Sequence, residues 1–548
     1  MRFDRWSVGT LAVAALVAMP IAAVAALALL PDDHAIWAHL VSTVLPGYVR
    51  TTIVLMLGVG LGTLVIGTGT AWLVTMCRFP GSRLFEWALL LPLAVPTYVV
   101  AYIFTDVLEY AGPVQGLLRD LFGWTSGRDY WFPEIRSVGG AIAVMTVALY
   151  PYVYLLARAA FLDQSVCVLE VSRTLGRGPW RAFWSVALPL ARPALVAGVS
   201  LVLMEALNDF GTVDFFAVRT FTAGIYDVWL NMNSTSGAAQ LACLLLAFVL
   251  VLIGAERWAR RGQKFHHATA RYRALSPARL GGWAAAGAVA ACALPVALGF
   301  LLPAGVLLKY AVVFHAETFT PRFWSHALNS LGLAGGSAIV AAAAGLFLAY
   351  GLRLSNTPLV RGAVRVAGIG YAVPGAVLAV GVMIPLARFD NAIDALARDW
   401  LGVSTGLLLS GTVVALGYGY LVRFLALANG TAEAGLARIT PGMDGAARTL
   451  GMTPGRVLHR VHLPMMRGSL LTAVLLVFVD GMKELPMTVI LRPFNFETLA
   501  TFVHQYASDE LLEECAAGAL AIVAFGLLPV IGLSASIRRS RPGHGGAA

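Results

Sequence analysis

Residues 170–192 read EVSRTLGRGPWRAFWSVALPLAR, and residues 444–467 read DGAARTLGMTPGRVLHRVHLPMMR. When Gly176 is aligned with Gly451, a shift of 275 positions, the residues Arg, Thr, Leu, Gly, Pro, Arg, Val, Leu, Pro and Arg coincide. Each copy is polar and rich in arginine, although the chain around it is strongly apolar. This duplication indicates an internal repeat, both copies of which are contacted from outside the lipid.

The composition places this repeat in a membrane protein. The 548 residues are 59% hydrophobic and 12% charged, whereas soluble domains carry roughly 25% charged residues. Apolar runs of about 20 residues, long enough to cross a bilayer as helices, recur along the chain. We therefore predict an all-α polytopic membrane protein with about twelve transmembrane helices. They are expected at about 8–30, 50–76, 86–106, 138–160, 194–214, 238–256, 283–309, 328–352, 364–387, 406–428, 468–490 and 516–536.

These helices form two sets of six. The first half is predicted to span 1–256 and the second half 282–548, with a basic linker at 257–281. Pro96 in the third helix corresponds to Pro374 in the ninth, and a proline there indicates a kink or a broken segment. Such a break is either an ordinary packing kink or part of a gate. Both halves are predicted to insert in the same sense, which makes them parallel repeats with a pathway between them.

The basic residues predict the orientation. Most of the 39 Lys and Arg residues, including the run from Arg423 to Arg467, fall in segments that are cytoplasmic if the N-terminus is inside. Both termini and both repeated stretches are then cytoplasmic, and the first helix is an uncleaved span rather than a signal peptide. The linker suits anionic lipid headgroups, and it lacks the base-reading pattern of a nucleic-acid contact. The five cysteines have no metal-ligand spacing, so a metal site stays unknown.

Each repeated stretch has the pattern of a helix–turn–helix. Gly176 and Gly451 interrupt helix-forming residues, and Pro179 and Pro454 suit the first turn of a new helix. The Leu-Pro pair that closes each copy is expected to set the angle at which the next membrane helix starts. The stretch is therefore either a cytoplasmic lever joined to a spanning helix or an elbow that only packs at the interface. Its duplication favours the lever.

This stretch resembles the signature of binding-protein-dependent ABC importer permeases, Glu-Ala-Ala followed by a glycine and later by an aliphatic residue and Leu-Pro. The matching residues are Glu170, Gly176, Val186, Leu188 and Pro189 in the first copy and Ala446, Ala447, Gly451, Val461, Leu463 and Pro464 in the second. Gly445 stands at the glutamate position of the second copy, with Asp444 one residue earlier. The resemblance implies the type I (MetI-like) transmembrane fold and coupling helices at about 165–190 and 440–465, which dock onto ATPase subunits.

The chain lacks the residues needed to hydrolyse ATP. A phosphate-binding loop requires Gly-Lys-Ser or Gly-Lys-Thr, and none of Lys264, Lys309 and Lys483 follows a glycine. We therefore predict that this chain is not an enzyme and binds no cofactor, and that two separate ATPase subunits use the ATP. The composition leaves no room for a soluble substrate-binding domain, so a separate periplasmic protein is expected to supply the substrate.

Polar residues inside the fifth and eleventh helices mark a candidate translocation pathway. They are Glu205, Asn208 and Asp209 in the fifth helix and Asp480, Lys483 and Glu484 in the eleventh, which correspond under the same shift. Spacings of three and four residues place each set on one helical face, and ionisable residues in a span normally face a bundle interior or a wet cavity. The alternative is structural, with Lys483 neutralising a nearby carboxylate. An excess of carboxylates suits a hard cation.

Residues 205–226 and 482–510 look like those of fused two-domain ferric-iron importer permeases. This resemblance implies alternating access in the bacterial inner membrane, with ferric iron delivered by a periplasmic protein. That protein is expected to dock on loops around 215–226 and 493–501, where Phe221 and Phe496 correspond. Related permeases carry thiamine or phosphonates. A different class, a twelve-helix transporter driven by an ion gradient, would use the carboxylates as proton sites.

Overall fold

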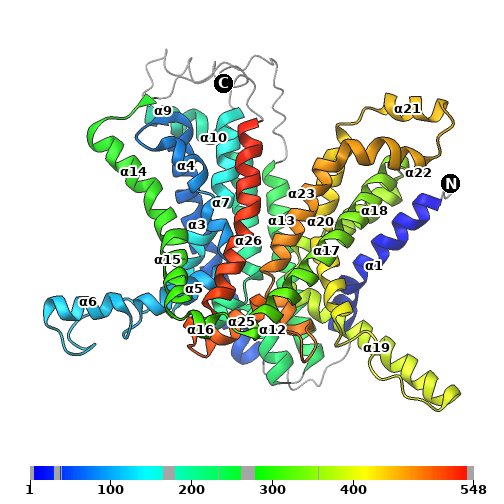
Figure 1. The fold of residues 1–548 in the computed structure, drawn as a ribbon, viewed down its shortest axis with the longest axis horizontal. Coiled ribbons are helices and arrows are strands. Elements are labelled where there is room, and N and C mark those ends of the chain that lie inside the picture. The colour runs from blue at the N-terminus through cyan, green and yellow to red at the C-terminus, as the bar shows by residue number, and fades with distance from the viewer. Residues whose placement is uncertain are drawn as a thin grey trace. The chain divides into compact units, whose positions relative to one another are not determined.

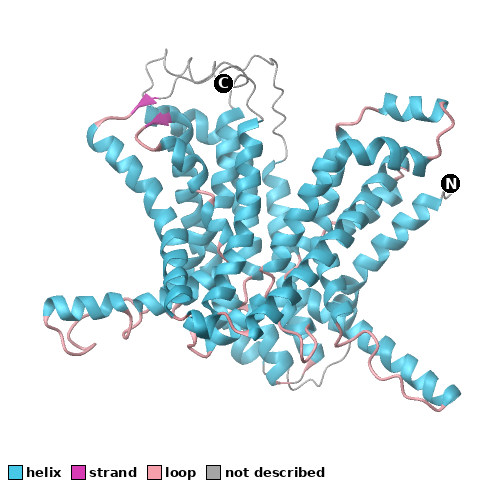
Figure 2. Cartoon of the chain, viewed as in Figure 1, coloured by secondary structure: helices cyan, strands magenta, loops and turns pink. Residues whose placement is uncertain are grey.

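The computed structural model describes residues 5–29, 38, 40–163, 179–232, 234–260, 278–355 and 357–539. Helices account for almost all of the secondary structure in these residues (Figure 2). The exception is a pair of two-residue strands, in which β1 (Cys77–Arg78) pairs in parallel with β2 (Ala278–Arg279). The predicted all-α class is confirmed.

The described residues contain 11 helical segments long and apolar enough to cross a membrane, or up to 12 if a bent pair counts as one span. The bent pair joins Ser82–Ala94 to Thr97–Phe122 at 91°. This agrees with the twelve helices expected from the apolar runs. The break falls at Pro96, which precedes α5 (Thr97–Leu108), and Pro374 likewise precedes α19 (Gly375–Leu401). Both prolines therefore mark broken segments, as predicted.

Two compact units interleave along the chain. Unit 1 comprises Met1–Val41, Gly224–Leu246 and Phe319–Phe502, and unit 2 comprises Ser42–Ala223, Ala247–Thr318 and Val503–Ala548. Each unit therefore combines most of one sequence half with segments of the other half (Figure 1). The halves 1–256 and 282–548 describe the repeat in the sequence, whereas these units describe the packing.

In unit 2, α7 (Val138–Asp163) packs against α3 (Leu45–Met76) and α10 (Leu188–Asn208). A Cβ on Gly67 would lie 2.8 Å from the backbone nitrogen of Tyr154, so this glycine lets α3 approach α7 closely. The other elements of this unit are η1 (Leu40–Val44) at its border, α4 (Ser82–Ala88), η2 (Leu91–Ala94), α5, α6 (Pro113–Phe122), α9 (Pro179–Ala182), η3 (Phe183–Ala187), α11 (Gly211–Phe215), α14 (Gly282–Val296), η5 (Ala297–Leu301), α15 (Leu302–Val313), α16 (His315–Thr318) and α26 (Leu512–Arg539).

In unit 1, α17 (Pro321–Leu354), α20 (Val413–Ala437) and α23 (Leu463–Met482) pack against one another. A Cβ on Gly345 would lie 2.7 Å from the backbone nitrogen of Asn429, which repeats the close approach seen at Gly67. The other elements are α1 (Arg5–Ala28), η4 (Asp227–Asn231), α18 (Pro358–Ala367), η6 (Gly370–Ala372), α19, α21 (Pro441–Thr449), α22 (Pro454–Val457), η7 (Leu458–His462) and α24 (Pro486–Leu491). Three helices, α12 (Phe221–Tyr226), α13 (Thr235–Arg260) and α25 (Leu499–Ser508), contain a boundary between the units.

Candidate functional site

The two repeated stretches fold alike where both are described. The elements α22, η7 and α23 begin at Pro454, Leu458 and Leu463, each 275 positions after the start of α9, η3 and α10. A proline opens α9 and α22, as predicted. The Leu-Pro pairs do not begin a helix after a turn, however, because helix runs without a break through 183–208 and 454–482. A five-residue π-helical turn precedes each pair and accommodates the proline, which lacks an N–H.

The first copy is only partly visible. Glu170 and Gly176 lie outside the described residues, so their predicted roles stay predictions. Val186 in η3 and Leu188 at the start of α10 are half-buried, and Pro189 is exposed. The contacts of the predicted coupling segment are therefore described for the second copy.

In the second copy, Gly451 makes the turn between α21 and α22. Its φ of 75° lies in the left-handed region, which glycine adopts without steric strain. The backbone N–H of Gly451 donates to Arg448 at 2.9 Å, and that of Met452 donates to Ala447 at 3.1 Å. These two bonds close the C-terminus of α21 in a Schellman motif. The predicted turn at Gly451 is thus present.

Asp444 ties α21 to two neighbouring helices. Its carboxylate lies 2.8 Å from Nε of Arg353 at the end of α17 and 2.7 Å from Nε2 of His462 at the end of η7. Arg353 also donates to the carbonyls of Leu436 and Ile439, at 2.7 and 2.8 Å. One arginine therefore holds both the end of α20 and the start of the coupling segment.

The electrostatics keep Asp444 charged. Partial burial alone would raise the pKa of Asp444, but hydrogen bonds and charge from Arg353 and His462 outweigh it and hold that pKa below its ordinary value. Charge-assisted hydrogen bonds of this kind are stronger than neutral ones. The carboxylate therefore acts as a fixed anionic connection between α17 and η7.

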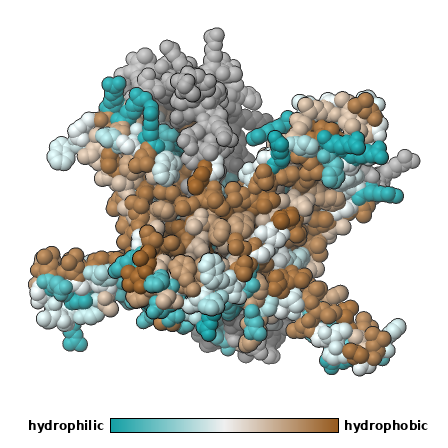
Figure 3. Space-filling view, in the orientation of Figure 1, coloured by the Kyte–Doolittle hydropathy of each residue, from teal (hydrophilic) through white to brown (hydrophobic). Residues whose placement is uncertain are grey.

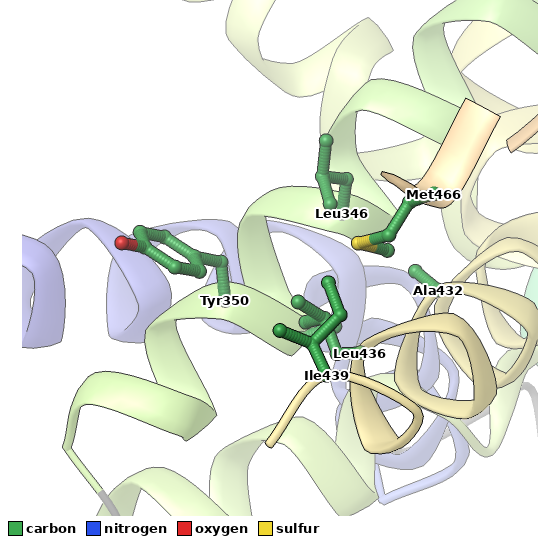
Figure 4. Close-up of a cluster of buried hydrophobic side chains, with 7 residues drawn as sticks. Leu346, Tyr350, Ala432, Leu436, Ile439 and Met466 are labelled. Carbon is green, nitrogen blue, oxygen red and sulfur yellow. The ribbon is translucent and has the colours of Figure 1, made fainter. Parts of the chain in front are cut away.

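A buried apolar cluster lies beneath this connection (Figure 4). Its members come from α17, α20, the turn after α20, and α23; they are Leu346, Ala349, Tyr350, Ala432, Leu436, Ile439 and Met466. Leu458 and Leu463 of the coupling segment pack against it, and the Tyr350 hydroxyl donates to the carbonyl of Pro454 at 2.7 Å. Leu463 is therefore a packing residue that joins the segment to the bundle.

The remaining residues of the second signature lie on both sides of the segment. Ala447 is buried and Val461 is half-buried, whereas Ala446, Gly451 and Pro464 are exposed. Met443 on α21 and Leu450, which caps the C-terminus of α21, lie three and four positions from Ala446 and are exposed as well. Residues three and four positions apart share a helical face, so α21 presents an apolar face outward. Met443 and Leu450 were not among the residues predicted for this site.

The intramembrane carboxylates Asp209 and Glu484 occupy equivalent places in the two repeats. Asp209 follows the end of α10 and accepts a hydrogen bond from the backbone of Thr212 at 2.8 Å. Glu484 follows the end of α23 and accepts one from the backbone of Met487 at 3.3 Å. Each carboxylate thus satisfies a free N–H in the first turn of the short helix that follows, α11 or α24.

Glu484 also forms a buried ion pair with Arg423. Glu484 Oε2 lies 3.0 Å from Nε of Arg423, and both side chains are 5% exposed. The prediction that Arg423 belongs to a cytoplasmic segment is wrong, because Arg423 lies in the middle of α20. The available signal was its position inside the predicted span at 406–428, where a charge calls for a partner.

Lys483 pairs with Asp480 at 3.0 Å, and both side chains are about a quarter exposed. Glu205 and Asn208 are half-buried on α10. The six predicted pathway residues therefore do lie at the ends of α10 and α23, three in each unit. A common pathway lined by all six stays a prediction.

Comparison with known proteins identifies the family. The family of binding-protein-dependent transport system inner membrane components matches residues 63–264. The molybdenum transport system permease protein of Escherichia coli K12 is 30% identical over 205 residues, which cover 86% of that protein and 36% of this chain. The chain belongs to this family of ABC importer permeases. It is a multi-pass membrane protein, and a family that depends on binding proteins implies an ATPase and a substrate-binding protein as partners.

Other relatives of the permease differ in how much of it they cover. An Fe(3+)-transport system permease protein of Haemophilus influenzae is 25% identical over 489 residues, which cover 87% of this chain and 88% of that protein. A putative 2-aminoethylphosphonate transport system permease protein of Salmonella choleraesuis is 28% identical over 204 residues, which cover 36% of this chain and 69% of that protein. The ferric relative therefore matches both halves, and the phosphonate relative matches about a third of the permease.

The structure corrects one predicted docking residue of the permease. Phe221 is 1% exposed and packs against Tyr48 and Phe248, with ring centroids 6.4 and 5.3 Å away. A side chain with no surface cannot contact a partner in this conformation, so Phe221 is a packing residue. Phe496 is half-buried, whereas Phe494 in the same loop is 97% exposed. The exposure of Phe494 makes it a better candidate than Phe496 for the surface on which the binding protein is predicted to dock.

Proposed function

We propose that this permease imports ferric iron, which a periplasmic binding protein delivers to it. The observation that carries this proposal is the similarity to the Fe(3+)-transport permease, which extends over 87% of the chain and includes both halves. The carboxylates at the ends of α10 and α23 have oxygen atoms of the kind that a hard cation prefers, although no three His, Cys, Asp or Glu side chains of the described residues are grouped as a metal site. The ion is the cargo here and is not a resident cofactor.

Two ATPase subunits are proposed to dock on the two coupling segments, with both termini of the permease in the cytoplasm. The exposed apolar face of α21 offers one docking surface. Closure of the ATPases on ATP would move α21, and the Asp444 connection would pass the movement to α17 and η7. The permease itself is proposed to bind no cofactor.

Movement of η7 reaches the intramembrane charges through a continuous helical segment. The chain is helical from Pro454 to Met482, and Glu484 is the second residue after this segment. The ion pair between Glu484 and Arg423 then joins the end of α23 to the middle of α20. This series of contacts supports alternating access, because a push on α21 displaces groups at the far end of α23.

Uptake by a deletion strain that expresses the permease with its own ATPase and binding protein tests the cargo. We expect uptake of radioactive ferric iron to depend on the permease, while uptake of molybdate, 2-aminoethylphosphonate and thiamine does not. Uptake of any of these in place of iron would contradict the proposal. An oxyanion is the second candidate, because the 30% identical relative is named for molybdenum transport.

Substitution on α21 tests the docking surface. Leu450→Asp introduces a charge at an exposed position, so folding should persist while ATPase stimulation by the loaded binding protein falls at least tenfold. Val403→Asp is the matched control. Val403 is also an exposed apolar residue, but it lies before α20, whereas α21 lies after α20. Equal stimulation in both variants would remove α21 from the docking surface. Replacing Gly176 and Gly451 together with bulky residues should likewise abolish stimulation.

A further inference from the structure

Each unit carries a short helical arm that continues from a membrane helix. The first arm is α6 in unit 2, which follows α5. The second arm is the last part of α19 in unit 1, residues 388–401. Figure 1 shows each arm extending away from the other helices of its own unit. The transport function proposed above does not use these arms.

The two arms repeat one another in sequence. Residues 116–124 read GLLRDLFGW and residues 395–403 read ALARDWLGV. At a shift of 279 positions, the coinciding residues are Leu117 and Leu396, Arg119 and Arg398, Asp120 and Asp399, and Gly123 and Gly402. Both glycines cap their helix in the left-handed region, with φ of 68° and 66°. The duplication that produced the coupling segments therefore also retained the arms.

Each arm exposes a stripe of large apolar side chains. Leu117 and Leu121 lie four residues apart on α6, as do Leu396 and Trp400 on α19, so each pair shares one helical face. Phe389 extends the second stripe by two turns. All five are exposed, with Leu121 at 71% and Trp400 at 83%. Figure 3 shows apolar side chains (brown) over both arms.

The opposite face of the first arm is covered by its own chain. Arg119 donates to the carbonyl of Tyr110 at 2.8 Å and to the Tyr130 hydroxyl at 3.2 Å. The Tyr130 hydroxyl donates to Oε1 of Gln115 at 2.6 Å. The segment that returns from the arm is therefore fixed to its polar face.

The second arm has the same arrangement with different residues. Asp394 accepts hydrogen bonds from the Ser404 hydroxyl and the Thr405 backbone, each at 2.8 Å. One turn earlier, the buried Asp390 accepts from the Ser410 backbone at 2.7 Å. Because the return segments are held on the polar faces, the apolar stripes stay outward, and the described part of each unit does not cover them.

The position of the arms indicates what covers the stripes. The second arm is continuous with a membrane span. Its return segment leads into α20, and α21 follows α20 in the chain. The arm and the coupling segment therefore lie at opposite ends of α20. An amphipathic helix that leaves a span at the membrane boundary lies in the interfacial plane. Tryptophan, here Trp400, is enriched at that depth.

We propose that both arms are interfacial anchors, which insert their apolar stripes into the bilayer surface opposite the coupling segments. The first arm carries one arginine and one aspartate, and the second arm carries two arginines and three aspartates, so neither arm has an excess of positive charge. Insertion therefore depends on apolar area, and the lipid does not need to be anionic. The anchors hold the broken helices that begin after Pro96 and Pro374 at a fixed depth.

Photo-crosslinking from the arms tests the proposal. A benzophenone amino acid is placed at Leu121 or Trp400, and in separate variants at Arg128 or Thr405, exposed residues of the return segments on the polar faces. The full-length permease is assembled with its ATPase in nanodiscs of zwitterionic lipid and illuminated with the binding protein present. We expect at least fivefold more lipid adduct, measured by mass spectrometry, from the two stripe positions than from the two return-segment positions.

Two outcomes would overturn the anchors. One is equal lipid labelling at stripe and return-segment positions, and the other is crosslinking of the stripe positions to the binding protein or to a second permease chain. If a probe disturbs folding at Leu121 or Trp400, Leu117 and Leu396 provide second positions on the same stripes. The lipid readout does not depend on the cargo, so failure of the iron proposal leaves this test intact.

Discussion

Asp444 Oδ1 lies 2.7 Å from Nε2 of His462, and this contact joins α21 to the helical segment that runs from Pro454 to Met482. The two residues are 18 positions apart, with the turn at Gly451 between them. Nε of Arg353, 2.8 Å from the other carboxylate oxygen, adds α17 to the same contact. In the second copy, where glycine occupies the glutamate position, Asp444 supplies the carboxylate that holds α21 in place.

Replacing this carboxylate should uncouple the segment. Asp444→Asn keeps the shape but removes the charge, and we expect a loss of about 1.5–3 kcal/mol of stability, the range for hydrogen bonds to charged groups. ATPase stimulation by the loaded binding protein should fall with it. Thermal unfolding in nanodiscs and ATPase assays measure the two effects. Asp399→Asn, an exposed carboxylate on α19, is the control and should change neither; an equal effect of both substitutions would refute the connection.

The contribution of Asp444 should depend on pH in a defined direction. The pKa of Asp444 is below its ordinary value of 3.8 in the folded protein, so the unfolded carboxyl takes up its proton first as the pH falls. The stabilisation is therefore complete above the ordinary pKa and is lost as the pH falls through the lower folded pKa. The difference in unfolding temperature between wild type and Asp444→Asn should shrink as the pH falls below about 4. A difference that grows on acidification would show that the sign is wrong.

The sequence predicted the elements of the fold because they depend on local signals. Apolar runs set the spans, Pro96 and Pro374 set the breaks, and Gly451 and Pro454 set the turn of the coupling segment. The arms had a local signal too, in the repeated Arg-Asp and glycine. Their shift of 279 positions differs from the 275 of the coupling stretches, so an alignment at one fixed shift does not reveal them.

The contacts between distant segments could not be predicted in this way. Arg353 is 91 residues from Asp444, and nothing near either residue indicates the other. Arg423 was assigned to a cytoplasmic segment because a count of basic residues does not show which one turns into the bundle to meet Glu484. The interleaved units likewise depend on packing between helices far apart in the chain. Phe221 was misassigned because exposure is a property of the fold.

Two glycines in the second coupling segment should respond to alanine in opposite ways. Gly451 has a φ of 75°, where a side chain costs about 1–2 kcal/mol, so Gly451→Ala should destabilise the permease. Gly445 lies inside α21, and a Cβ there would meet no heavy atom within 4 Å. Gly445→Ala should therefore stabilise by about 0.5–1 kcal/mol through the greater helix propensity of alanine. Thermal unfolding compares the pair, and shifts of the same sign would contradict this account of the turn.

The buried pair of Arg423 and Glu484 should be costly to break and much less costly to replace. Removing one partner leaves an uncompensated charge in a site where both side chains are 5% exposed, at a cost of about 3–5 kcal/mol. Replacing both with apolar residues of similar volume removes both desolvation penalties, so Arg423→Met with Glu484→Leu should recover most of that stability.

A double-mutant cycle on thermal unfolding measures the coupling energy of this pair. Lys483 and Asp480, about a quarter exposed, provide the matched pair, and removing one of them should cost about 0–1 kcal/mol. If Arg423→Met alone costs no more than Lys483→Met alone, the ion pair is not what stabilises the junction of α20 and α23. If the apolar double variant is stable but transports no iron, the charges themselves are needed for transport, because the packing at this junction is then intact.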